Sequence, residues 1–184
     1  MSSNDLKTLS VAKKDVDQLY DEVNELRNGV FYFLKGRGET SVASGRFYIS
    51  LLGVIFDLVE DLSYLSDVSY QHVNNNHSGL KKSQIKDLNE IYESLSSVFK
   101  EGIEAFSLQF DEKEFQDVLE QKTVNIDLLN SKIDAQILRT QNETSPKTTA
   151  LYFNILVRTK DLILHKFNLV EEFFQVTKDV KSSQ

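Results

Sequence analysis

Two pairs of side chains in the sequence have the types and the spacing of metal ligands. Asp57 and Asp61 form the first pair, and Asp161 and His165 form the second. Residues four apart lie on one face of a helix, so each pair would present its two groups side by side. If the two helices face one another, the four groups could together hold a divalent or ferric ion.

The alternative, which we prefer, is that these four groups have a structural role. Acidic side chains beside the apolar face of a helix are often solvated or paired with neighbouring cations, and Arg158 and Lys160 lie close in the sequence. On this interpretation the protein requires no cofactor. A metal-binding helical bundle remains as an alternative function.

His72 and His77 bracket three asparagines in the stretch HVNNNH. Five residues on a regular helix separate two side chains by about 140°, so these histidines could not chelate one ion from a helix. Asparagine tolerates the left-handed backbone conformation that ends helices. The stretch is therefore predicted to be the C-terminus of a helix and the turn after it.

The sequence lacks the motifs of common catalytic centres. It contains no cysteine, no Gly-x-Ser-x-Gly elbow, no glycine-rich phosphate loop and no His-Glu-x-x-His pair. We therefore expect a protein that is not an enzyme. The rival interpretation is a metal-dependent enzyme that uses the four candidate ligands.

The composition restricts the partners that the protein could bind. The chain has 184 residues and a formal net charge of −7, without a basic stripe, so nucleic acids and anionic membrane surfaces are poor candidates. The most apolar stretch, residues 47–59, is shorter than the roughly 20 residues that a membrane-spanning helix needs. We expect a soluble, cytoplasmic protein.

Apolar residues recur at helical spacing along the chain, and one proline and seven glycines leave room for long helices. Five helices are predicted, at about residues 5–34, 42–73 and 83–108, then after the N-cap Asp111, and from Pro146 to about residue 178. The loops between them are short, so neighbouring helices should be antiparallel. The sequence thus predicts an all-α bundle that forms one domain, residues 1–184, with halves of about 1–108 and 109–184.

Two of these helices carry apolar stripes, each on one face. The first is a heptad stripe of Leu9, Ala12, Val16, Leu19, Val23, Leu26, Val30 and Phe33. The second, in the third helix, consists of Ile85, Leu88, Tyr92, Leu95, Phe99 and Phe106. Such stripes pack against neighbouring helices, and the heptad would serve a contact within the molecule or between two copies.

An internal repeat relates two of the predicted helices. A shift of 104 residues aligns ETSVASGRFYISLLGVIFDL, which begins at Glu39, with ETSPKTTALYFNILVRTKDL, which begins at Glu143. Seven of the 20 positions are identical, and they extend beyond the cap residues to Asp57 and Asp161. We therefore predict a duplicated hairpin, in which helices 1 and 2 correspond to helices 4 and 5.

Two stretches resemble a known family. LSYLSDVSYQHVNNNHSGLKKSQIKDL (residues 62–88) and ETSPKTTALYFNILVRTKDLI (residues 143–163) resemble the cytosolic C-terminal region of Pit-type inorganic phosphate transporters, in the long form of Bacteroidetes. That region is PhoU-like. The resemblance implies repeated three-helix bundles with an acidic Glu/Asp-x-x-x-Asp motif on the middle helix, where some members bind metal ions. Asp57 and Asp61 match the motif, whereas His165 replaces the second acid of the second repeat.

The resemblance also implies a function. A PhoU-like domain of this kind would lie on the cytosolic side of the inner membrane and regulate phosphate transport through helix-to-helix contacts with the membrane portion of a permease. The alternative is a generic helical adaptor that binds other protein helices or associates as a homodimer.

Overall fold

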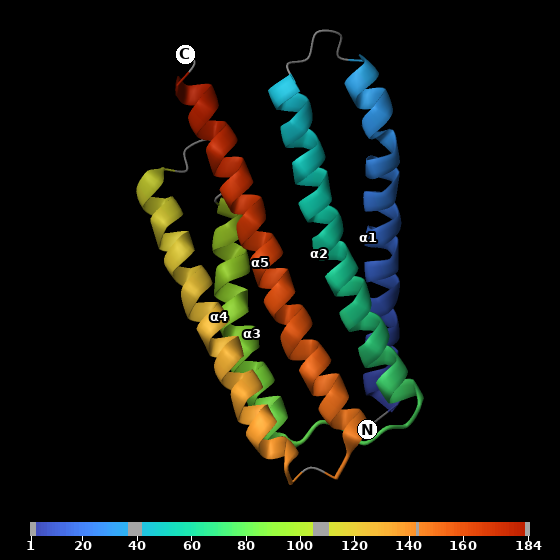
Figure 1. Ribbon diagram of the computed structural model, residues 1–184. Helices are drawn as coiled ribbons and strands as arrows, with labels where there is room; N and C mark the ends of the chain where they lie inside the picture. The colour runs from blue at the N-terminus through green and yellow to red at the C-terminus, as the bar shows by residue number, and fades with distance from the viewer. Residues whose placement is uncertain (1–2, 37–41, 105–110, 143, 183–184) are drawn as a thin grey trace.

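Five α-helices make up the part of the chain that the computed structural model describes, residues 3–36, 42–104, 111–142 and 144–182 (Figure 1). They are α1 (Ser3–Gly36), α2 (Val42–Asn74), α3 (Lys82–Glu104), α4 (Glu112–Thr140) and α5 (Pro146–Ser182). No strand occurs in these ranges, so the prediction of an all-α bundle is confirmed. The predicted end of the third helix, near residue 108, lies outside the described residues.

The predicted start of α4 is confirmed at atomic detail. The side chain of Asp111 accepts a hydrogen bond from the backbone N–H of Glu114 at 2.9 Å. In return, the Glu114 carboxylate accepts one from the backbone N–H of Asp111 at 2.9 Å. This capping box satisfies two N–H groups that the first helical turn leaves without partners.

The end of α2 confirms the role predicted for the asparagines. Asn76 has a φ of 54°, in the left-handed region. The backbone N–H of His77 then bonds the carbonyl of His72 at 3.1 Å, and that of Asn76 bonds Val73 at 3.0 Å. These two bonds are the pattern of a Schellman motif, which closes the C-terminus of a helix.

The helices are arranged around a central antiparallel pair, α2 and α5 (Figure 1). On one side, α1 packs against α2 and against no other described helix. On the other side, α3 and α4 pack against α5 and against each other. Within the described residues, α3 therefore packs with α4 and α5 as a three-helix unit.

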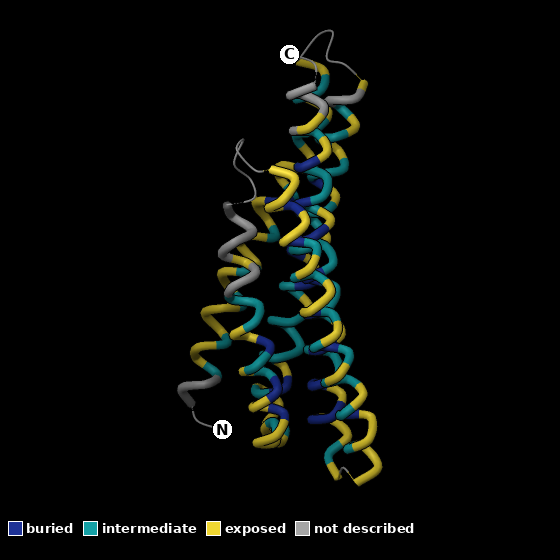
Figure 2. Tube along the Cα trace, turned by 90° about the vertical axis from the view of Figure 1, so that its left-hand side faces the viewer, coloured by how far each residue is buried: buried dark blue, intermediate teal, exposed yellow. Residues whose placement is uncertain are grey.

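An apolar core cluster lies within that three-helix unit. Its buried members are Ile91, Phe115, Val118, Leu129, Tyr152, Leu156, Ile163, Phe167, Val170 and Phe174. The rings of Phe115 and Phe174 stack with centroids 4.1 Å apart and fix α4 against α5. Buried residues lie where the helices meet, and exposed residues cover their outer faces (Figure 2).

Both predicted apolar stripes are only partly buried. On α1, Val23 is buried, but Leu19 is 39% and Leu26 54% exposed. On α3, Leu88 and Leu95 pack against the core, whereas three other members of the stripe remain exposed: Ile85, Tyr92 and Phe99. Neither stripe is fully buried, because among the described helices α1 contacts only α2, and α3 contacts only α4 and α5. Phe106 lies outside the described residues.

Candidate functional site

Asp61 is the predicted ligand that the fold buries most deeply, at 2% exposure in the α2–α5 interface. Its Oδ1 accepts a hydrogen bond from Nη1 of Arg158 at 3.0 Å. Its Oδ2 lies 3.0 Å from Nδ1 of His165. A carboxylate removed from water needs such partners, so both of its oxygens are satisfied by α5.

The other two predicted ligands lie at the edge of this contact. Asp161 is 3.6 Å from the same Arg158 guanidinium, and Asp57 is exposed on α2. Across residues 3–36, 42–104, 111–142 and 144–182, no three His, Asp or Glu side chains are placed to hold one metal ion. The contacts thus favour the ion-pair interpretation for Arg158 over the four-ligand metal site. Lys160, the other predicted cation, instead donates to Asn130 on α4 at 2.9 Å.

Sequence reasoning missed a second buried carboxylate, Asp87 on α3. It accepts hydrogen bonds from Arg139 at 2.6 Å and from the Tyr152 hydroxyl at 3.0 Å, and Lys132 lies 3.2 Å away. Lys132 also pairs with Glu90. On α3, Asp87 shares a face with Gln84 and Ile91, three and four residues away, and all three are buried. The predicted stripe followed a neighbouring face, so it did not select Asp87.

The surroundings of Asp87 shift three pKa values. Burial alone would raise the pKa of Asp87, but the hydrogen bonds from Arg139, Tyr152 and Lys132 outweigh it and lower the pKa. Burial and the bond to Asp87 raise the pKa of the Tyr152 hydroxyl. The bond to Glu90 raises the pKa of Lys132. The cluster therefore keeps its charges at neutral pH and joins α3, α4 and α5.

The structure brings the rings of His72 and His77 together across the turn that was predicted between them. Their ring centroids are 5.1 Å apart. As predicted, the helix ends close to residue 73: α2 ends at Asn74, and the left-handed residue Asn76 turns the chain so that His77 lies beside His72. The two rings line a pocket of about 210 Å³ between the end of α2 and the start of α5.

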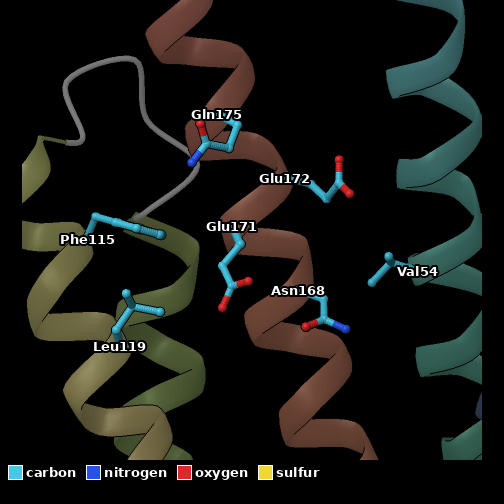
Figure 3. Close-up of a pocket in the computed structure, with 7 residues that line it drawn as sticks. All are labelled: Val54, Phe115, Leu119, Asn168, Glu171, Glu172 and Gln175. Carbon is cyan, nitrogen blue, oxygen red and sulfur yellow. The ribbon is translucent and has the colours of Figure 1, made fainter.

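A larger pocket of about 630 Å³ lies between α2, α4 and α5 (Figure 3). Its lining is Val54, Phe115, Leu119, Asn168, Glu171, Glu172 and Gln175. Figure 3 shows Phe115 and Leu119 on α4, Val54 across from them on α2, and the polar side chains on α5 between. The pocket thus combines apolar walls with two carboxylates.

The two carboxylates of this pocket differ in their partners. Glu171 is paired with Lys122 on α4 at 2.8 Å. Glu172 has no ion pair with any described residue, and Figure 3 shows its side chain directed toward α2. The pocket can therefore accept a basic group beside an apolar one.

Comparison with known proteins does not identify a family for this chain. No protein family, curated protein or solved structure matches the chain. Within the described ranges, none of the five helices combines the length and the apolar character needed to cross a bilayer.

Proposed function

We propose that the chain is a non-catalytic helical domain that binds a helix of a partner protein and thereby regulates inorganic phosphate transport. The observation that carries the binding proposal is the pocket between α2, α4 and α5. Recognition of an amphipathic helix typically uses a few apolar anchors that enter such a cavity, with polar contacts at its rim.

The charge of the pocket specifies the expected partner. Val54, Phe115 and Leu119 offer apolar walls, and Glu172 offers a carboxylate that is not already paired with a described residue. A partner helix with one basic residue three or four positions from an apolar one would match both features. We therefore expect a basic amphipathic segment rather than an acidic one.

The phosphate part of the proposal rests on the resemblance of residues 62–88 and 143–163 to the PhoU-like domain of Pit-type transporters. On this basis the partner is the membrane portion of a phosphate permease, and the domain lies at the cytosolic face of the inner membrane. Because fold-level similarity alone does not define a function, the proposal needs a direct test.

The duplicated, PhoU-like arrangement belongs to the same proposal. Gly36 and Thr140, which end α1 and α4, are 104 residues apart, as are Val42 and Pro146, which begin α2 and α5. Asp61 and His165, also 104 residues apart, are in contact. Equivalent positions meet in this way when they lie close to a local twofold axis between two repeats.

Uptake of labelled phosphate by cells of the source organism tests this function. Leu119→Arg should fill the pocket and change uptake in the same direction as removal of the whole domain. Val124→Arg, on an exposed position of α4, should leave uptake unchanged. Equal uptake with the native domain, without the domain and with either variant would contradict a role in phosphate transport.

A further inference from the structure

The hydrogen bond of His72 fixes the state of its ring. Nε2 lies 2.8 Å from the backbone carbonyl of Ser78, an atom that can only accept, so Nε2 carries the proton. In the neutral imidazole the lone pair is then on Nδ1. Nδ1 has no hydrogen-bond partner among the described residues. Metal-binding histidines are commonly held in this way, with the second ring nitrogen bonded to a backbone carbonyl.

His77 lies close enough to His72 for the two imidazoles to share one metal ion. Its ring centroid is 5.1 Å from that of His72, and the planes are inclined by 58°. With metal–nitrogen bonds of about 2.1 Å, two imidazoles that share one ion have ring centroids roughly 5–6 Å apart. The ring of His77 forms no hydrogen bond with a described residue, so its nitrogens are available.

The pocket beside the rings provides room for an ion and for further ligands. Its volume is about 210 Å³, and Gln71 and Asn75 line it together with the two histidines. Their amide oxygens and water can occupy the remaining coordination positions. Lys147 also lines the pocket, but it is exposed on α5 and its flexible side chain can keep the ammonium group in solvent.

We propose that His72 and His77 form a binding site for a late first-row divalent metal ion such as Cu²⁺, Ni²⁺ or Zn²⁺. Two imidazoles without a carboxylate select these ions over Mg²⁺ and Ca²⁺, which prefer oxygen ligands. The site is distinct from the four residues that the sequence analysis selected, and it does not depend on the proposed transport function. An ion held there would bridge α2 to the turn that follows it.

The test uses Cu²⁺, which binds nitrogen sites most tightly of these ions. The full chain, freed of metal with a chelator, is titrated with Cu²⁺ and followed by electron paramagnetic resonance. We expect one ion per chain with the hyperfine pattern of two imidazole nitrogens. His77→Ala should remove one of them and weaken binding by roughly tenfold or more. His77 lies in a turn outside the helices, so this variant should keep the helical circular dichroism spectrum.

His165→Asn is the matched control, because it removes the third and last histidine of the chain. It should leave the affinity and the spectrum unchanged. Binding that survives in His77→Ala but is lost in His165→Asn would overturn the proposal and place the ion at the Asp61 contact. Binding only at millimolar Cu²⁺, or a spectrum without imidazole nitrogen, would also overturn it.

Discussion

Asp87 joins three helices through one carboxylate, and its removal is the clearest residue-scale prediction. Asp87→Ala would leave Arg139 and Lys132 without their buried partner. We expect the free energy of unfolding to fall by about 3 kcal/mol, as when other buried ion pairs lose one member. Urea denaturation measures this change. Asp127→Ala, at an exposed position of α4, should alter stability by less than about 0.5 kcal/mol.

The pH dependence of stability follows from the lowered pKa of Asp87. Its contribution is complete above the unfolded-state pKa of about 3.9 and is lost as the pH falls through the lower folded-state value. Below about pH 4, the native protein should therefore lose stability more steeply than Asp87→Asn does. If the free energy of unfolding fell by the same amount in both proteins between pH 5 and pH 3, that result would contradict this prediction.

How far the sequence predicts the site differs from residue to residue. The sequence named Arg158 and Lys160 as possible partners of the carboxylates, and Arg158 is the one that pairs with Asp61. The approach of His77 to His72 did not follow, because it depends on the direction of the chain after the left-handed residue Asn76. Helical periodicity carries no information about a residue beyond the end of a helix.

At the scale of the element, the left-handed turn after α2 gives a direct test. Asn76 has a positive φ, which a β-branched side chain tolerates poorly and glycine adopts freely. Asn76→Val should lower the free energy of unfolding by roughly 1 kcal/mol, and Asn76→Gly should leave it unchanged or slightly higher. Denaturation midpoints compare the two variants. An equal loss in both would show that the asparagine side chain, and not the backbone conformation, stabilises the turn.

Helix boundaries were largely predictable, because the sequence contains their chemical signals. The capping box at Asp111 and the proline at 146 mark the starts of α4 and α5, and both starts are observed. The burial of the helix faces was less predictable. Apolar spacing shows that Ile85 and Leu88 belong to one broad face, but only the packing of α3 shows that Ile85 is exposed.

At the scale of the molecule, stability should be uneven along the chain. The buried core cluster described above is formed by α3, α4 and α5, whereas α1 packs only on α2 among the described helices. Amide hydrogens of α1 should therefore exchange faster than those of α5, because few buried contacts oppose its local opening. Hydrogen exchange measured by mass spectrometry gives the comparison. Equal protection of the two helices would contradict the unequal packing.

The most direct test of the central claim is to identify what occupies the pocket between α2, α4 and α5 in living cells. A photocrosslinking amino acid is introduced at Gln175, an exposed residue of the pocket lining, and at Val124 as the control. The proposed function predicts an adduct from position 175, but not from 124, with a basic helical segment of a membrane phosphate permease. No adduct at position 175, or an adduct only with a protein unrelated to phosphate transport, would contradict it.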